Sequence, residues 1–250
     1  MNEVITFLQA NPGKLIRIGT GELTDSLSLD HITKHSSVLI PFFMKQKNAL
    51  LELKTKSDNI NNLVHRQLRP HKNIVVSWSL NPPFIINTCE HGGVSLVRRL
   101  EAARKCRDAG YAIGIHLDPV ILYQEWEKDY RNLIASIFRY INPQDIIWLS
   151  IAGFRYTSRL KNIIRERWPQ TRLFLGEMIK CPDHKYRYIR PVRTEAYRKL
   201  VKWIRDFGPA IPIYFCMENP AVWRDVFGKL PSEIDNLSHV FTRPGKHIGA

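Results

Sequence analysis

The sequence has few cysteines, and no two of them lie close together. Its 250 residues contain four: Cys89, Cys106, Cys181 and Cys216, with no C-x-x-C pair. This spacing argues against a disulfide framework or a zinc site and is typical of a reducing cytoplasm. No apolar run is long enough to cross a bilayer, and no secretory signal precedes the first apolar segment. We therefore expect a cytoplasmic protein without a metal site of its own.

Acidic residues are also scarce relative to basic ones. The chain has 37 Lys and Arg against 23 Asp and Glu, which gives a formal net charge of +14. Such a field attracts polyanions, so nucleic acid is a plausible partner, and a merely solvated basic surface is the alternative. There is no internal repeat, low-complexity tract or linker, and the length suits one large domain over residues 1–250.

Apolar, β-rich runs recur along almost the whole chain. Several are continuously apolar, as expected of parallel strands that are buried on both faces. Helical patterns at 94–111, 125–141, 159–168 and 195–208 separate several of them, and this alternation predicts an α/β fold with a parallel sheet. The predicted strands are 15–21, 50–57, 74–81, 112–120, 146–154, 172–177 and 211–218.

Polar residues follow several of these strands at their carboxyl ends, where ligands bind in parallel α/β folds. Turn and cap residues would give the same pattern at any single strand. The lysines in LLELKTKS are more informative, because a buried lysine should face an anion or a carboxylate. The residues in question are Glu22, Thr24, Asp25, Lys54, Lys56, Ser57, Ser77, Ser79, Asn81, His116 and Asp118.

Several motifs occur together and in a fixed order. They are RIGTGELTDSLSLDHIT, ELKTKSDNINNL, VSWSLNPP, EHGG-x4-RRLEAARKC-x2-AGY, IGIHLDP and W-x3-Y. From about Leu15 to Phe227 the chain resembles the spore photoproduct lyase family of radical S-adenosylmethionine (radical SAM) enzymes. The resemblance implies a partial parallel (β/α) barrel, S-adenosylmethionine, a four-iron four-sulfur (4Fe-4S) cluster and a 5′-deoxyadenosyl radical. In spore photoproduct lyase, a DNA repair lyase, this chemistry acts on a thymine dimer in UV-damaged DNA.

The resemblance also assigns cofactor-binding residues. GTGE looks like the motif that meets the methionine end of the cofactor, with its glycines allowing close backbone approach and Glu22 accepting a hydrogen bond from the α-ammonium group. Thr24 and Asp25 would touch the methionyl group, and Lys56 would bind its carboxylate. The full set of expected cofactor-binding residues is Gly19, Thr20, Gly21, Glu22, Thr24, Asp25, Lys56, Ser79, Asn81 and Asp118.

The chain departs from the family pattern at the cluster ligands. The family holds its cluster with CxxxCxxC after the first barrel strand, and this sequence has no such motif. We therefore expect a barrel without its first strand and cluster loop, from a truncated gene product, a split gene or a misassigned start. A separate N-terminal fragment could carry the cysteines. Whether this chain alone is an enzyme stays open.

The chain departs from the family pattern at a second position, and one basic segment is a candidate for substrate binding, so the substrate stays open. Spore photoproduct lyases carry a hydrogen-donating cysteine where this chain has Glu22. The loop or hairpin at 180–193 is basic and aromatic, and Arg187 and Tyr188 are expected to contact a phosphate and a base. The alternatives are a non-catalytic nucleic-acid-binding domain and a radical enzyme acting on a small molecule.

Overall fold

Six parallel strands form one curled sheet, in the order β1-β2-β3-β4-β5-β9. The computed structural model describes residues 1–21, 24–64 and 73–234. This architecture confirms the predicted partial parallel barrel. The strands are β1 (Ile16–Thr20), β2 (Ala49–Thr55), β3 (Ile74–Ser79), β4 (Ala112–Val120), β5 (Ile146–Gly153) and β9 (Ile213–Phe215).

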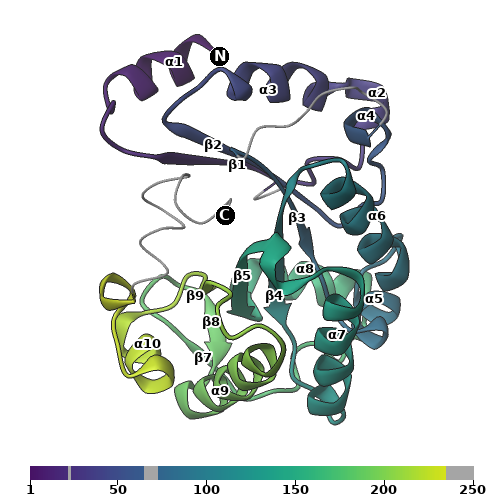
Figure 1. Cartoon of the computed structure of the whole chain (residues 1–250). Coiled ribbons are helices and arrows are strands. Elements are labelled where there is room, and N and C mark those ends of the chain that lie inside the picture. The colour runs from purple at the N-terminus through teal and green to yellow at the C-terminus, as the bar shows by residue number, and fades with distance from the viewer. Residues whose placement is uncertain (22–23, 65–72, 235–250) are drawn as a thin grey trace.

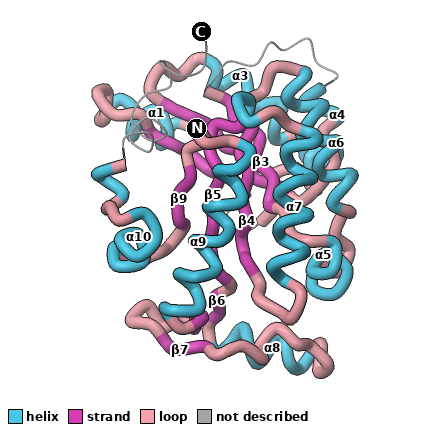
Figure 2. Tube along the Cα trace, turned by 60° about the horizontal axis from the view of Figure 1, so that its bottom comes forward, coloured by secondary structure: helices cyan, strands magenta, loops and turns pink. Residues whose placement is uncertain are grey.

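Helices cover the outer face of this sheet and leave its inner face towards the open side of the half-barrel (Figures 1 and 2). Short 3-10 helices occupy Pro143–Asp145 and Pro231–Glu233. The α-helices are α1 (Asn2–Gln9), α2 (Asp30–Thr33), α3 (His35–Met44), α4 (Asn61–Val64), α5 (Pro83–Cys89), α6 (Leu96–Asp108), α7 (Trp126–Tyr140), α8 (Ser158–Arg167), α9 (Arg190–Phe207) and α10 (Pro220–Phe227).

Burial on both faces explains why the strands are so apolar. Every residue of β3 is buried, and β2 is buried except at Lys54. Outward-facing residues such as Leu51 and Leu53 join the main core beneath the helices, whereas Leu50, Val75 and Trp148 form a smaller cluster on the inner face. The inner face is therefore apolar at one level and carries polar side chains at others.

Local signals define the long helices. The Ser95 side chain accepts a hydrogen bond from Arg98 N and caps α6, which is followed by Gly110 at φ +94°. Such a capping residue and a glycine after the last turn are the usual start and stop of a helix. Helices α6, α7 and α8 match the predicted 94–111, 125–141 and 159–168 segments.

A second, antiparallel sheet in the order β6-β8-β7 follows strand β5. It consists of β6 (Arg155–Tyr156), β7 (Met178–Lys180) and β8 (Tyr186–Tyr188). The predicted strand at 172–177 is wrong: the segment forms turns, and Leu175 is exposed. Its apolar residues Leu173 and Phe174 instead pack on a small core cluster that includes Tyr156 and Tyr188.

The segment predicted as a loop or hairpin at 180–193 starts at the end of β7, turns back as the antiparallel strand β8, as a hairpin does, and then enters the first turn of α9. The helix was expected at 195–208 but begins at Arg190. Pro191 lies in its first turn, where a missing backbone N–H leaves no intrahelical bond unmade. Arg193 is therefore not a loop residue: it is buried, and its Nε lies 2.9 Å from Glu218 Oε1.

Candidate functional site

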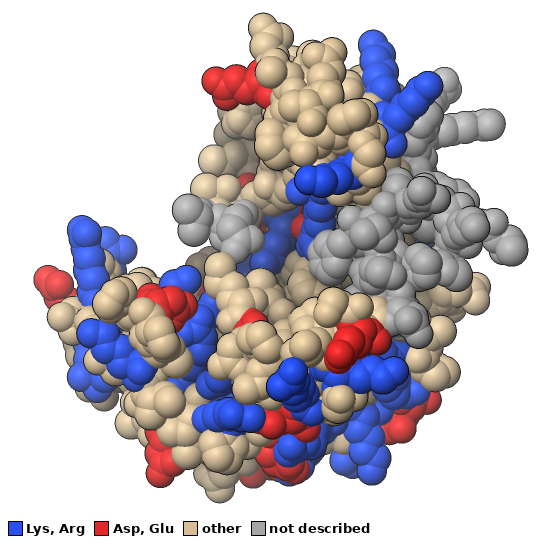
Figure 3. Space-filling model, turned by 90° about the vertical axis from the view of Figure 1, so that its left-hand side faces the viewer, with Lys and Arg blue, Asp and Glu red and all other residues tan. Residues whose placement is uncertain are grey.

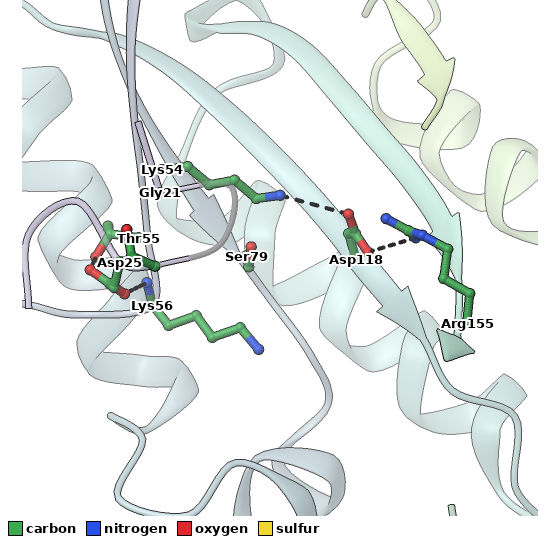
Figure 4. A pocket seen from close by; sticks show the side chains of 9 residues that line it. Gly21, Asp25, Lys54, Thr55, Lys56, Ser79, Asp118 and Arg155 are labelled. Carbon is green, nitrogen blue, oxygen red and sulfur yellow. Dashed lines mark hydrogen bonds and ion pairs between the residues drawn. The ribbon is translucent and has the colours of Figure 1, made fainter. Parts of the chain in front are cut away.

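A pocket of about 390 Å³ lies at the carboxyl ends of β1 to β4. The edge of the sheet where polar residues were expected to meet therefore carries a cavity of the size that small ligands occupy. The pocket is lined by Gly21, Thr24, Asp25, Lys54, Thr55, Lys56, Ser79, Asp118 and Arg155 (Figure 4).

Six of the ten expected cofactor-binding residues line this pocket: Gly21, Thr24, Asp25, Lys56, Ser79 and Asp118. Gly19 and Thr20 lie on β1 beside it, and Thr20 Oγ1 shares a hydrogen bond of 2.8 Å with Ser26 Oγ. Asn81 is fully buried just beyond β3. The prediction for Glu22 lies outside the described residues.

Gly21 forms a wall of the pocket that no other residue could form without rearrangement. Its φ is +86°, and a Cβ added there would lie 2.4 Å from the Lys54 carbonyl oxygen and 2.7 Å from Ser26 Oγ. Only glycine adopts such a backbone conformation at no cost. The glycine therefore allows the β1 end to pack directly against the end of β2.

Asp25 organises this wall from within the protein. Its Oδ1 accepts hydrogen bonds from Leu27 N and Ser28 N at 2.9 Å and from Thr55 Oγ1 at 2.6 Å. Its Oδ2 accepts from Lys56 N at 2.7 Å. These contacts tie the loop after β1 to the end of β2, so Asp25 holds the pocket's shape with its acceptors already engaged.

Glu90, in the loop after α5, gathers three neighbours beside the pocket. Lys56 Nζ lies 2.6 Å from its Oε1, Asn81 Nδ2 donates to the same oxygen at 2.9 Å, and Arg99 Nη2 donates to Oε2 at 2.6 Å. Burial alone would raise the pKa of Glu90, but the charges of Lys56 and Arg99 outweigh it and the pKa is lowered. The carboxylate stays ionised and orients Lys56.

Asn81 belongs to this network and not to the pocket lining. Its Oδ1 accepts a hydrogen bond from the buried Tyr130 hydroxyl at 3.0 Å, while its amide nitrogen serves Glu90. The Tyr130 hydroxyl in turn accepts from Ile121 N. Asn81 therefore positions Glu90 in this structure, and its contact with a ligand stays a prediction.

Three charged residues meet at the opposite end of the pocket. Lys54 Nζ lies 3.6 Å from Asp118 Oδ2, and Arg155 Nη1 lies 3.3 Å from Asp118 Oδ1. Figure 4 shows Lys54 and Arg155 approaching Asp118 from two sides, with Lys56 extending to a different part of the pocket. The side chains of Lys54, Arg155 and Asp118 are 17%, 16% and 12% exposed.

A layer of buried polar side chains lies deeper on the same inner face. Glu52 Oε2 accepts two hydrogen bonds from Arg17, and Glu52 Oε1 lies 2.7 Å from both Ser77 Oγ and His116 Nε2. Arg17 also donates to the Tyr214 hydroxyl and lies over the Trp148 ring. We call Arg17, Glu52, Ser77 and His116 the Glu52 cluster.

The Glu52 cluster is an ionised carboxylate held by three donors. Burial would raise the pKa of Glu52, but its hydrogen bond with His116, together with the Arg17 charge and the Ser77 hydroxyl, lowers the pKa to about 2. Burial lowers the pKa of His116. A neutral imidazole that donates from Nε2 to the carboxylate satisfies both directions.

Arg187 and Tyr188 make contacts within the protein. Both Arg187 Nη atoms donate to the Asp183 carboxylate at 2.7 Å. Tyr188 is 3% exposed, packs in the small core cluster and accepts a hydrogen bond from Leu122 N. The expected stacking of Tyr188 on a base is therefore not available to the ring in this position.

The four cysteines lie on different elements. Cys106 is buried in α6, whereas Cys216 is half-buried after β9. Across residues 1–21, 24–64 and 73–234, no group of three or more His, Cys, Asp or Glu side chains could hold a metal ion. In the same part of the chain, no helix has the length and apolar character needed to span a membrane.

The fold and pocket define a partial (β/α) barrel with a pocket lined by charged residues at the carboxyl ends of its strands. The family model for spore photoproduct lyase matches residues 2–210. The chain therefore belongs to the spore photoproduct lyase family.

Individual relatives agree. The chain is 26% identical over 173 residues to spore photoproduct lyase from a Geobacillus species, which covers 68% of this chain and 50% of that protein. It is 25% identical over 180 residues to the Bacillus subtilis enzyme, which covers 71% of this chain and 52% of that protein. The chain thus spans about half the length of these curated relatives.

Solved structures of spore photoproduct lyase are also similar. One complexed with dinucleoside spore photoproduct has a TM-score of 0.80 and 25% identity, over 86% of this chain and 65% of that one. A mutant with bound AdoMet and dinucleoside spore photoproduct has a TM-score of 0.78 and 25% identity, over the same shares of the two chains.

Some of the site's residues were not among the predicted ligands. Arg155 lies on a two-residue strand outside the main sheet, and no sequence pattern marks it. Glu90 opens the quoted EHGG block, and its spacing from Arg99 was the available signal. Glu52 lies two residues before Lys54 on β2, so a period of two places both side chains on the same face.

Proposed function

We propose that this chain is the barrel portion of a spore photoproduct lyase-like radical SAM lyase, which binds S-adenosylmethionine in the pocket at the carboxyl ends of β1 to β4. One observation carries the proposal: in a member of this family, Gly21, Thr24, Lys56 and Ser79 converge on one cavity. A similar solved structure contains bound AdoMet. The bound cofactor would supply the 5′-deoxyadenosyl group for radical chemistry.

Several residues in and beside the pocket have a role in this proposal. Lys56 would pair with the cofactor's carboxylate, because its ammonium lies at the pocket and is held by Glu90. Gly21 would let a ligand approach the backbone, and Thr24 and Ser79 would offer hydroxyl groups. Gly19, Thr20, Asp25 and Asn81 would support the wall, and Glu22 would receive the α-ammonium group, as the resemblance implies.

The 4Fe-4S cluster does not fit the residues of this chain. A cluster needs cysteine thiolates gathered at one place, and the four cysteines lie on separate elements. We derive no step through the cluster. Its ligands would have to come from a segment outside this sequence, on the same or a separate polypeptide. Anaerobic reconstitution of this chain should therefore give far fewer than about four irons per chain.

DNA carrying a UV-induced pyrimidine lesion is the proposed substrate. Residues 155–193 contain eleven Lys and Arg against three Asp and Glu. Figure 3 shows basic side chains gathered over the lower part of one face. In a similar solved structure, spore photoproduct lyase is complexed with dinucleoside spore photoproduct. We propose Arg187 as part of the DNA-facing hairpin, with Tyr188 as its internal support.

The proposal also includes the domain organisation and the cellular compartment. Residues 1–250 would form a single domain, since one core cluster extends from Leu8 to Trp223. The protein would work in the cytoplasm, since its cysteines are free and free thiols are usual in a reducing compartment.

Isothermal titration of S-adenosylmethionine into the chain tests the proposal. We expect binding to weaken by about ten- to a hundredfold in Lys56→Met, the size of a lost hydrogen bond to a charged group. Lys199→Met is the matched control, because Lys199 Nζ also lies 2.6 Å from a glutamate, Glu127, on the helical surface. Equal affinities for the two variants would contradict the proposed site.

A further inference from the structure

Lys54 and Arg155 bring hydrogen-bond donors to the pocket that the described residues do not satisfy. Lys54 Nζ is 3.6 Å from Asp118, beyond hydrogen-bonding distance, and the side chain is 17% exposed. Arg155 donates one hydrogen bond of 3.3 Å to Asp118 from Nη1. A guanidinium has five N–H donors and an ammonium three, so most of these donors have no acceptor among the described residues.

The charges at this end of the pocket do not balance. Among the described residues, Lys54 and Arg155 share one carboxylate, that of Asp118, so these three side chains carry one surplus positive charge. Asp25, the other acid in the pocket lining, already accepts four hydrogen bonds at the opposite end. Partly buried like charges are costly unless an anion joins them, so one monovalent anion would complete the group.

Position indicates which anion this is. An S-adenosylmethionine carboxylate and a phosphodiester are both oxyanions that suit lysine and arginine. Lys56, held by Glu90, is available to the carboxylate at the β1–β2 end, and Lys54 points elsewhere, towards Asp118 (Figure 4). Arg155 follows β5 and opens the basic segment 155–193. The second anion is therefore closer to the proposed nucleic-acid side.

We propose that Lys54 and Arg155, held apart by Asp118, form an oxyanion subsite for the phosphodiester that links the two nucleosides of the lesion. This inference rests on the proposed function. Asp118 serves as a spacer that keeps both cations directed into the pocket. The ligand oxygens take over the donors that Asp118 leaves unused.

The test compares two probes that differ only in charge. They are the dinucleotide spore photoproduct and its methylphosphonate counterpart, in which the linkage is neutral, each titrated into the whole chain by calorimetry. We expect the chain to bind the charged probe about tenfold or more tightly, as hydrogen bonds to charged groups imply. In Lys54→Met/Arg155→Met this ratio should fall close to one.

Two further variants keep the test decisive if the pocket variant is poorly folded. Arg107→Met/Lys199→Met removes the same two kinds of charge from ion pairs outside the pocket and outside residues 155–193 and should keep the ratio. Asp118→Asn removes the competing carboxylate and should raise affinity for the charged probe severalfold, which a damaged pocket could not do.

Two outcomes would contradict the proposed oxyanion subsite. Equal binding of the two probes by the parent chain would overturn the subsite. So would a double variant that loses S-adenosylmethionine affinity and keeps the charge ratio, since the oxyanion would then be the cofactor's carboxylate. Failure of the proposed function would look different: no S-adenosylmethionine binding and no preference for the lesion over undamaged thymidine dinucleotide.

Discussion

Two charged groups lie on the same inner face of the sheet, and they differ in how completely their donors and acceptors are used. In the Glu52 cluster, Arg17, Ser77 and His116 contact one carboxylate at 2.5 to 2.9 Å. Around Asp118 the contacts with Lys54 and Arg155 are 3.6 and 3.3 Å. The first group is closed and stabilises the barrel. The second is open and suits a ligand.

The largest expected effect is the loss of stability on removing the carboxylate charge of the Glu52 cluster. Glu52→Gln removes the buried carboxylate charge that the part-buried Arg17 guanidinium contacts, and breaking such a pair typically costs about 3–5 kcal/mol of unfolding free energy. Urea unfolding followed by circular dichroism measures it. Asp118→Asn is the matched comparison and should cost less, because the 3.6 and 3.3 Å contacts of Asp118 with Lys54 and Arg155 are longer and weaker. Similar losses for both variants would remove the distinction.

Acid should break the same group without mutation. The pKa of Glu52 is lowered to about 2 from an ordinary value of 4.5, so its contribution is complete above pH 4.5 and is lost as pH falls towards 2. The pKa of His116 is also lowered, which adds loss as pH falls below 6.5. The Glu52 shift is worth about 3 kcal/mol. The unfolding free energy of Glu52→Gln should therefore depend less on pH across this range than that of the parent chain. An unchanged pH dependence would contradict the assignment.

Gly21 offers a way to disturb the open site through its backbone. Gly21→Ala combines a positive φ with a Cβ 2.4 Å from the Lys54 carbonyl, and such strain costs about 1–3 kcal/mol. Gly92→Ala is the control, because Gly92 also has a positive φ, +73°, with nothing within 4 Å of an added Cβ. Thermal unfolding should rank Gly21→Ala as the more destabilised variant, with weaker S-adenosylmethionine binding. The opposite ranking would show that the wall is not tightly packed.

A smaller effect is expected in the β7–β8 hairpin, where Tyr188 makes internal contacts and is not expected to contact a ligand. Tyr188→Phe leaves Leu122 N without its acceptor and should lower the unfolding free energy by about 1 kcal/mol. Affinity for lesion-containing duplex DNA, measured by fluorescence anisotropy, should stay within about twofold, because the buried ring offers no face to a base. A large loss of DNA affinity at unchanged stability would restore Tyr188 as a contact residue.

The alternation of side chains along parallel strands made much of the pocket predictable. Because the carboxyl ends of neighbouring strands meet at one edge, Gly21, Lys56, Ser79 and Asp118 could be expected there. Periodicity could not reveal Arg155, which reaches the pocket from a separate two-residue strand. Composition also could not predict that Tyr188 is buried and that Arg187 is paired. A basic aromatic segment has the same composition whether it lies exposed on a surface or packs over a small core.

Hydrogen exchange with and without S-adenosylmethionine tests the central claim, that the open end of the sheet is the ligand site, most directly. We predict slower exchange at the amides of Thr24–Ser28 and Lys54–Ser57, where Asp25 ties the two strand ends together. The amides of β1 and β2 beside Arg17 and Glu52 should change little. Two results would contradict the account. One is slower exchange only at the β1 and β2 amides beside Arg17 and Glu52. The other is slower exchange only around the hollow between α9 and α10 that Arg190 and Arg198 line.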